Sequence, residues 1–342
     1  MLDASACVRA PDGGLFLREP FPDPLLVSIA IAVAGRNVYV GTARYTAPAE
    51  SGGDAGLPYV GAVDRESDNG ATSEPLTAPA FNFGALASDG ARLYYVQTSG
   101  RVVQPGSSEY TVIAPASIDL ATGAVHPIAT LASPWPSSSN LNSDMIAATP
   151  AWPGVFWIGG GQGAEAATTL STWDPASDTV TTVATGQSLS GPAVDATGVY
   201  WADTGGGQGI TVYRSPFGGG PQQTLVNVPG GTHGVLLGVS TTDVVFVGDS
   251  ATAPIFAVSK GGGTARLLMT ATLPWLNAFA WVDDIYLYWV EPVGSSTLQR
   301  IPVAGGPVVV LPTQGQIQSM AFDACNVYIA SQGPGRLFAL PK

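Results

Sequence analysis

Short apolar runs separated by polar, glycine-rich turns recur along the whole chain of 342 residues. In the segment ITVYR at 210–214, apolar and polar residues alternate, which is the pattern of a strand buried on one face. Glycines between such runs supply the positive φ angles that tight hairpin turns need. The pattern therefore predicts an all-β chain made of many short strands.

One motif occurs seven times: a small or apolar run, a short turn and then an aromatic-rich strand. The equivalent strand positions are Tyr39, Tyr94, Phe156, Tyr200, Val245, Tyr288 and Tyr328. The last four intervals are 40 to 45 residues long, and polar insertions at 43–80 and 132–143 lengthen the first two. Each copy continues with a further strand, a glycine turn and an apolar strand, as in LQRIPVAGGPVVVL. Four short strands at this period are the signature of a β-propeller blade.

The two chain ends complete each other in this scheme. The seventh copy stops after its third strand, RLFALP, and the N-terminal segment APDGGLFLREP has the form of a missing fourth strand. Joining the two removes an exposed sheet edge. We therefore predict a single all-β domain over 1–342, a seven-bladed β-propeller of four-stranded antiparallel blades, closed by the N-terminal strand. The expected blades span about 24–78, 79–135, 136–187, 188–231, 232–272, 273–316, and 317–342 together with 12–20.

The segment VYWAD at 199–203 is close to the YWTD motif of receptor propellers. Through it the chain resembles the broad superfamily of YWTD-like and gluconolactonase-like (regucalcin-like) propellers. Only this copy keeps the Asp, and receptor YWTD domains have six blades where this chain has seven copies. The resemblance implies the fold and little about activity, because one propeller fold serves many functions. It also implies that a divalent cation could bind near the axis, as in gluconolactonase-like propellers.

Composition narrows the classes of partner. Hydrophobic residues make up 45% of the chain, which is enough for a large core. The net charge is −12, and the only lysines are Lys260 and Lys342, so nucleic acid is excluded as a partner. No apolar run approaches the roughly 20 residues of a membrane-spanning helix. We expect a monomer that binds a small molecule, a glycan or a protein.

The N-terminus and the cysteines bear on the compartment. The start MLDASACVRAPDGG has no basic and apolar signal region, and its small residues at 4–7 are typical of a processed export junction. Cys7 and Cys325 lie near opposite chain ends, which the predicted closure brings into one blade. A Cys7–Cys325 disulfide would lock that blade and indicate an oxidising compartment, whereas two unpaired thiols are the alternative. We expect an exported protein: periplasmic, lipoprotein-derived or secreted.

Candidate chemistry lies where the first strand of each repeat begins, since these strands open at the central channel of a propeller. Most of these positions carry polar side chains in otherwise apolar or small strands. They are Val27 or Ser28, Asn82, Asp144 with Asn142 nearby, Ser188, His233, Asn277 and Gln316. Such a set is typical of a small-ligand site, and the alternative is a water-filled channel.

Two functions are compatible with this set. The first is a binding or scaffold protein. The second is an enzyme of lactonase or lyase type, in which His233 and Asp144 are the candidate catalytic residues and His233 acts as base. Asp144, Asn82 and Asn277 would then hold a divalent cation such as calcium, although one carboxylate binds calcium weakly. Virginiamycin B lyase, also seven-bladed, uses His and Glu near its axis, but no acidic partner for His233 is evident.

The remaining motifs are interpreted as scaffold. GGGQG at 205–209 and the similar run at 159–163 are turns, because no Lys-Ser or Lys-Thr and no helix follows them. DTGG at 203–206 lacks the second copy that aspartic-protease chemistry needs. Asx turns are expected at Asp119, Asp174, Asp178 and Asp195. His126 is expected on an outer, surface strand.

The aromatic residues divide into two groups. Packing between blades is expected for Tyr200, Trp201, Trp157 and Trp289, which lie on second strands. Trp135, Trp152 and Trp275 lie near loops, where a tryptophan could stack on a sugar or another flat ligand.

Overall fold

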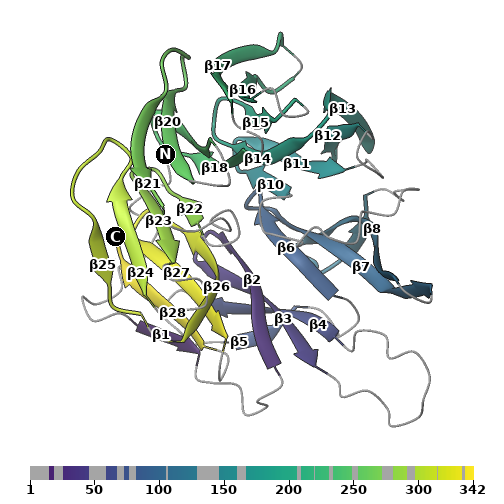
Figure 1. The fold of residues 1–342 in the computed structure, drawn as a ribbon. Helices are drawn as coiled ribbons and strands as arrows, with labels where there is room; N and C mark the ends of the chain where they lie inside the picture. The colour runs from purple at the N-terminus through teal and green to yellow at the C-terminus, as the bar shows by residue number, and fades with distance from the viewer. Residues whose placement is uncertain are drawn as a thin grey trace. The chain divides into compact units, whose positions relative to one another are not determined.

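The fold was obtained as a computed structural model of the full chain. It describes residues 15–18, 26–45, 59–67, 73–76, 82–104, 107–128, 146–159, 167–205, 209–218, 220–230, 234–248, 253–271, 280–290, 297–313, 315–332 and 336–342. These residues form strands β1 to β28 and no helix (Figure 1). The strands make seven four-stranded antiparallel sheets. The predicted fold class, a seven-bladed β-propeller, is confirmed.

The chain divides into two compact units. The first comprises Asp144–Gly159 and Glu165–Gln314, and the second comprises Leu2–Ser143, Gly160–Ala164 and Gly315–Lys342. We number the blades 1 to 7 in chain order, so the first unit holds blades 3 to 6 and the second holds blades 1, 2 and 7.

The strands of the first unit follow one another in each sheet in chain order. Blade 3 consists of β10 (Ile146–Thr149), β11 (Trp152–Gly159), β12 (Thr168–Asp174) and β13 (Thr179–Gly186). Blade 4 consists of β14 (Leu189–Val194), β15 (Val199–Asp203), β16 (Gly209–Ser215) and β17 (Gln223–Pro229). Blade 5 consists of β18 (Val235–Val239), β19 (Asp243–Val247), β20 (Pro254–Ser259) and β21 (Arg266–Thr270). Blade 6 consists of β22 (Ala280–Val282), β23 (Tyr286–Val290), β24 (Leu298–Pro302) and β25 (Val309–Leu311).

The second unit contains the sheet that joins the chain ends. Blade 1 consists of β2 (Leu26–Ala34), β3 (Asn37–Tyr45), β4 (Tyr59–Ser67) and β5 (Ser73–Pro75). Blade 2 consists of β6 (Asn82–Ser88), β7 (Arg92–Gln104), β8 (Ser107–Asp119) and β9 (Val125–Pro127). Blade 7 consists of β26 (Gln316–Phe322), β27 (Asn326–Gln332), β28 (Arg336–Pro341) and β1 (Leu15–Arg18). In it β1 pairs antiparallel with β28, with Leu15 opposite Ala339, which confirms the predicted closing strand.

The aromatic residues Tyr200, Trp201 and Trp289 of second strands pack between neighbouring blades, as predicted. Successive residues of a strand point to opposite faces of its sheet. Tyr200 lies in one apolar cluster with Leu236 and Phe246 of blade 5. Trp201, the next residue, lies in another cluster with Phe156 of blade 3. Both aromatic side chains are almost fully buried, which explains why this position is aromatic in most copies.

The turn aspartates mostly behave as predicted. Asp119 accepts hydrogen bonds from the N–H groups of Ala121 and Thr122, and Asp174 accepts one from Ala176. Asp178 has a different contact: its Oδ1 accepts a 3.0 Å hydrogen bond from the Trp173 indole, and its backbone is left-handed with φ of 52°.

Two other predicted features fall on turns and outer strands. His126 lies on β9, the outer strand of blade 2, and is exposed, as predicted. Gly205 has a φ of +52° in the turn after β15, as a turn glycine requires.

Candidate functional site

The predicted ligand-binding residues lie partly in the described structure. Asn142, Asp144, His233 and Asn277 lie outside the described residues. Asn82 is the first residue of β6, but its side chain is not among those described. The side chains of Ser188 and Gln316 are described, and these two residues belong to different units. The site as a set, including its catalytic and metal-binding residues, therefore stays a prediction.

The described positions of this set do lie where first strands begin. β6 begins at Asn82, and β26 begins at Gln316, which is partly buried. Ser188 is exposed and directly precedes β14. In blade 1, the strand β2 begins one residue before Val27.

Backbone groups hold Ser188 beside the end of β15. Its N–H donates a 3.2 Å hydrogen bond to Oδ1 of Asp203, and its carbonyl accepts one of 3.2 Å from the N–H of Thr204. Asp203 Oδ1 also accepts a 2.9 Å hydrogen bond from the N–H of Gly205. Asp203, from the DTGG segment, thus fixes the entry to β14 and the turn after β15, which agrees with its interpretation as scaffold.

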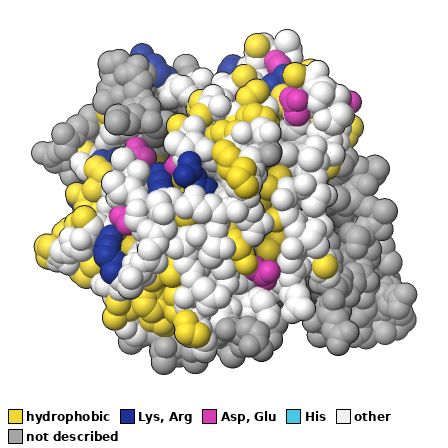
Figure 2. Space-filling model, turned by 90° about the horizontal axis from the view of Figure 1, so that it is seen from above, with side chains coloured by type: hydrophobic (Ala, Val, Ile, Leu, Met, Phe, Trp, Pro, Cys, Tyr) yellow, Lys and Arg dark blue, Asp and Glu magenta, His cyan; other side chains and the backbone are white. Residues whose placement is uncertain are grey.

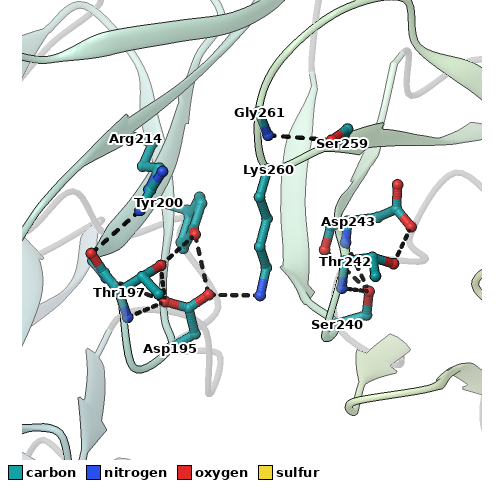
Figure 3. Close-up of polar contacts among 11 residues, drawn as sticks. Asp195, Thr197, Tyr200, Arg214, Ser240, Thr242, Asp243, Ser259, Lys260 and Gly261 are labelled. Carbon is teal, nitrogen blue, oxygen red and sulfur yellow. Dashed lines mark hydrogen bonds and ion pairs between the residues drawn. The ribbon is translucent and has the colours of Figure 1, made fainter.

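A polar cluster lies at the other end of β14, in the turn that leads to β15 (Figure 3). Oδ1 of Asp195 accepts hydrogen bonds from the N–H groups of Thr197 at 2.6 Å and Gly198 at 3.1 Å, and from the Thr197 hydroxyl at 2.7 Å. Oδ2 of Asp195 accepts the Tyr200 hydroxyl at 3.1 Å and pairs with Nζ of Lys260 at 2.6 Å. Lys260 comes from blade 5 and reaches across to blade 4.

The electrostatics of this cluster follow from burial and pairing. Burial alone would raise the pKa of Asp195, but the Lys260 ammonium and the hydrogen bonds from Thr197 outweigh it and lower the pKa below its usual value. Burial raises the pKa of Tyr200 to about 12, with the negative charge of Asp195 adding to it and the Thr197 hydrogen bond opposing it. At neutral pH Asp195 is a carboxylate and Tyr200 a phenol. The carboxylate bonds are all made within the protein, so the cluster stabilises the turn and the contact between blades.

The Asp–Tyr hydrogen bond recurs in four of the seven blades. The tyrosine follows the aspartate by five residues, and its hydroxyl donates to Oδ2. The pairs are Asp89–Tyr94 at 2.6 Å, Asp195–Tyr200 at 3.1 Å, Asp283–Tyr288 at 3.0 Å and Asp323–Tyr328 at 2.6 Å. Burial and the neighbouring carboxylate raise the pKa of Tyr94 and Tyr288 as well. Recurrence at equivalent positions indicates a structural role for the pair.

Oδ1 of each aspartate has an equally constant role. It accepts the N–H groups of the residues two and three positions later, as Asp89 does from Ala91 and Arg92. Sequence reasoning missed the pair, although the spacing Asp-x-x-x-x-Tyr is visible in the printed sequence. Reading back five residues from the aligned tyrosines would have found it.

Three blades carry other residues at the aspartate position. They are Ala34 in blade 1, Ala151 in blade 3 and Ser240 in blade 5. The residues at the tyrosine position of these blades are Tyr39, Phe156 and Val245. In blade 5 the Ser240 hydroxyl replaces the carboxylate as acceptor for the N–H of Asp243, at 3.0 Å.

Of the three loop tryptophans, only Trp152 lies among the described residues, and its ring is stacked on another side chain. Trp152 stacks on Phe217 with ring centroids 5.3 Å apart and an interplanar angle of 22°. This ring face is therefore used in packing, and the expectation that Trp152 presents an open face to a sugar is not met there. Trp135 and Trp275 lie outside the described residues.

Within the described part of the chain, no group of three or more His, Cys, Asp or Glu side chains is placed to hold a metal ion. The same part of the chain contains no helix long and apolar enough to cross a membrane.

The chain is similar to known proteins in structure but not in sequence. No protein-family model matches the chain, and no curated protein shows significant sequence similarity to it. The uncomplexed acylaminoacyl peptidase of Pyrococcus horikoshii matches with a TM-score of 0.61 and 11% identity over 93% of this chain. The match covers 51% of that peptidase, so the chain spans about half of its length.

Two further structures match over nearly their whole length. An oligogalacturonate lyase in complex with manganese has a TM-score of 0.58 and 12% identity, covering 93% of this chain and 91% of the lyase. The β-propeller domain of the Trilobed protease from Pyrococcus furiosus has a TM-score of 0.58 and 11% identity, covering 92% and 93%. At identities this low, the similarity shows a shared fold only and says nothing about activity. The chain is therefore a β-propeller similar to lyase and peptidase propellers, and its resemblance to the YWTD-like and gluconolactonase-like superfamily stays a prediction.

Proposed function

We propose that the chain is an extracytoplasmic β-propeller that binds a small polar ligand where the first strands of its blades begin. The observation that carries the proposal is the position of Asn82, Ser188 and Gln316. Each is the first residue of the first strand of its blade or directly precedes it. The remaining predicted residues, Asn142, Asp144, His233 and Asn277, would complete the site.

A comparison of the two ends of β14 supports placing the ligand at the end where this strand begins. At the far end, the fold itself uses the Asp195 carboxylate, which accepts four described hydrogen bonds and pairs with the Lys260 ammonium. At the near end, Ser188 is exposed, and its described hydrogen bonds involve only its backbone. Polar side chains that the fold does not use are available to a ligand.

The chemistry of the predicted residues favours a neutral ligand. The set contains amides, a hydroxyl, one carboxylate and one imidazole, and no Lys or Arg. Amide and hydroxyl groups both donate and accept, as sugar hydroxyls do. The net charge of −12 disfavours an anionic ligand, and Figure 2 shows no continuous basic patch among the described side chains on the face drawn. A neutral glycan is therefore the ligand class that this set suits best.

Isothermal titration of neutral oligosaccharides into the full chain tests the proposal. The triple variant Asn82→Ala, Ser188→Ala, Gln316→Ala should lose most of the binding heat. The double variant Gln222→Ala, Thr264→Ala is the control, because both residues are exposed in turns between outer strands. Equal loss of binding in both variants would contradict the assigned location.

An enzyme of lactonase or lyase type is the second candidate. The fold similarity to an oligogalacturonate lyase solved with manganese supports it. In this reading His233 is the base, and Asp144, Asn82 and Asn277 hold a divalent cation such as calcium or manganese. Metal analysis of the purified protein separates the two candidates. A stoichiometric divalent ion that the Asp144→Ala variant lacks, with turnover lost in His233→Ala, would favour the enzyme.

Export and a Cys7–Cys325 disulfide form part of the same proposal. Cys325 lies in the turn between β26 and β27, and its carbonyl accepts a 2.9 Å hydrogen bond from the N–H of Lys342, just past β28. β1 runs antiparallel to β28, so the chain enters β1 beside this end of blade 7. Cys7 lies outside the described residues. Thiol counting on unreduced protein tests the pairing, and two free thiols would rule it out.

A further inference from the structure

A residue just after the third strand of one blade packs against the first turn or the second strand of the blade before it. The first turn is the one between the first and second strands. The contacting residues are equivalent in sequence: Phe217 in SPFGGG, Lys260 in VSKGGG and Val303 in IPVAGG. They follow β16, β20 and β24, the third strands of blades 4, 5 and 6. All of these contacts lie within the first unit.

At the junction of blades 3 and 4 the contact is aromatic. Phe217 stacks on Trp152 with centroids 5.3 Å apart and on Phe156 at 5.7 Å. Phe156 occupies the tyrosine position of blade 3, and the aspartate position holds Ala151. The two positions that hold the Asp–Tyr pair in other blades carry no carboxylate and no phenol hydroxyl here, so the Phe217 ring packs against aromatic rings.

At the junction of blades 4 and 5 the contact is ionic. Nζ of Lys260 lies 2.6 Å from Oδ2 of Asp195, and the two side chains are only 18% and 16% exposed. The ammonium also lies 5.9 Å from the ring centroid of Tyr200, within the range of a cation–π contact. Here the first turn carries the Asp–Tyr pair, and the following blade supplies a cation.

At the junction of blades 5 and 6 the contact is aliphatic. Val303 is buried in one apolar cluster with Val245, which occupies the tyrosine position of blade 5. In the second unit, the junction of blades 1 and 2 also has an apolar contact. There Leu120, the residue after β8, packs against the apolar cluster that contains Ala34 and Tyr39.

Two hydrogen bonds that do not involve the Lys260 side chain hold its turn beside blade 4. The N–H of Gly263 donates to the carbonyl of Leu225 at 3.0 Å, and Nε2 of Gln223 donates to the carbonyl of Gly261 at 3.3 Å. Both bonds join blade 5 to β17 of blade 4. Whatever side chain stands at position 260 is therefore held against the first turn of blade 4.

We propose that Phe217, Lys260 and Val303 form a matched set in which each side chain is complementary to the first turn and the second strand of the preceding blade. Lys260 is the member that matches the Asp195–Tyr200 turn. A mismatch would bury an unpaired carboxylate or ammonium, which costs far more than an apolar contact gains. The set thus disfavours wrong packing of otherwise similar blades, since specificity comes from penalising the wrong partner.

Transplanting one junction onto another tests the proposal. Lys260→Phe alone leaves Asp195 nearly buried without its cation, and we expect the unfolding equilibrium constant to rise by about tenfold or more. The triple variant Asp195→Ala, Tyr200→Phe, Lys260→Phe copies the residues of the blade 3–blade 4 junction, namely Ala151, Phe156 and Phe217. It should recover at least half of the loss in midpoint temperature. A triple variant that is no more stable than Lys260→Phe would overturn the proposal.

A charge-removal cycle gives a second reading with smaller changes in shape. Lys260→Met should destabilise the protein in the native background and have little effect in the Asp195→Ala background. Hydrogen exchange of peptides spanning 195–203 reports the junction even where unfolding is irreversible. Exchange there should rise in Lys260→Met and return toward the native level in the double variant. Equal effects of Lys260→Met in both backgrounds would show that Lys260 and Asp195 act independently, contrary to the proposal.

Discussion

The hydroxyl of Tyr328 donates a 2.6 Å hydrogen bond to Oδ2 of Asp323, and both residues are buried. Oδ1 of the same carboxylate accepts the N–H groups of Cys325 and Asn326, each at 2.7 Å. One aspartate side chain therefore joins two backbone N–H groups of the turn to a tyrosine hydroxyl of the following strand. The same arrangement in blades 2, 4 and 6 makes this turn a structural unit shared by four of the seven blades.

Removing the tyrosine hydroxyl should weaken the fold by a measurable amount. Tyr94→Phe removes the donor to Asp89, and we expect a loss of about 1.5 to 3 kcal/mol in the free energy of unfolding, as for a buried hydrogen bond to a charged group. Asp89→Ala should cost more than Tyr94→Phe, because it also leaves the N–H groups of Ala91 and Arg92 without their acceptor. Urea unfolding followed by tryptophan fluorescence measures both.

Tyr213→Phe is the control for this prediction. Tyr213 is only partly buried and stacks on Trp201, with ring centroids 5.7 Å apart. We expect its loss to stay within about 0.5 kcal/mol. A Tyr94→Phe effect no larger than that of Tyr213→Phe would show that the Asp–Tyr bond contributes nothing.

The blade 4–blade 5 cluster should give stability a dependence on pH at both extremes. The pKa of Asp195 is lower in the folded protein than the unfolded value of about 3.9, so its contribution is present above that pH and is lost as pH falls through the folded pKa. Burial raises the pKa of Tyr200 to about 12, above its unfolded value of about 10. Its contribution is therefore complete below about pH 10 and is lost as pH rises through the folded pKa.

Two variants check these arms of the pH profile. Asp195→Asn should flatten the acid arm of the free energy of unfolding, and Tyr200→Phe should flatten the alkaline arm. Urea titrations at a series of pH values measure both, with Tyr213→Phe as the alkaline control. An alkaline arm that is the same in Tyr200→Phe and the native protein would refute the role of Tyr200.

Turn glycines should differ in their tolerance of a side chain. Gly209, at the start of β16, has a φ of +122°, and an added Cβ would collide with the carbonyl of Val228. Gly230 has a φ of +84°, with nothing within 4 Å of such a Cβ. Gly230→Ala should cost about 1 to 2 kcal/mol from backbone strain alone, and Gly209→Ala clearly more. Equal midpoint temperatures for the two variants would contradict this difference.

The sequence was enough to predict the fold because each blade repeats an aromatic second strand that must be buried. The truncated seventh copy and the N-terminal segment LFLRE also predicted the pairing of β28 with β1. The Asp–Tyr turn was visible in the spacing but was overlooked, because alignment of apolar strands gives no weight to a polar residue five positions earlier. The aromatic pattern predicts only packing for Tyr200, whose hydroxyl also donates a hydrogen bond to Asp195.

The partner of Lys260 could not be predicted in the same way. Asp195 and Lys260 lie in different blades, and pairing them requires knowing that the turn after a third strand meets the first turn of the preceding blade. The starts of the first strands were placed well enough at Asn82, Ser188 and Gln316. Which ligand they would bind depends on side-chain directions, which repeat spacing does not contain.

The most direct test of the proposed function is a parallel titration of two ligand classes into the full-length protein. Calorimetry would compare a panel of neutral oligosaccharides with trigalacturonate, the latter with and without manganese. We predict binding of a neutral oligosaccharide that the Asn82→Ala, Ser188→Ala, Gln316→Ala variant loses. Binding only of trigalacturonate, dependent on manganese and accompanied by its cleavage, would contradict the account and establish the lyase alternative.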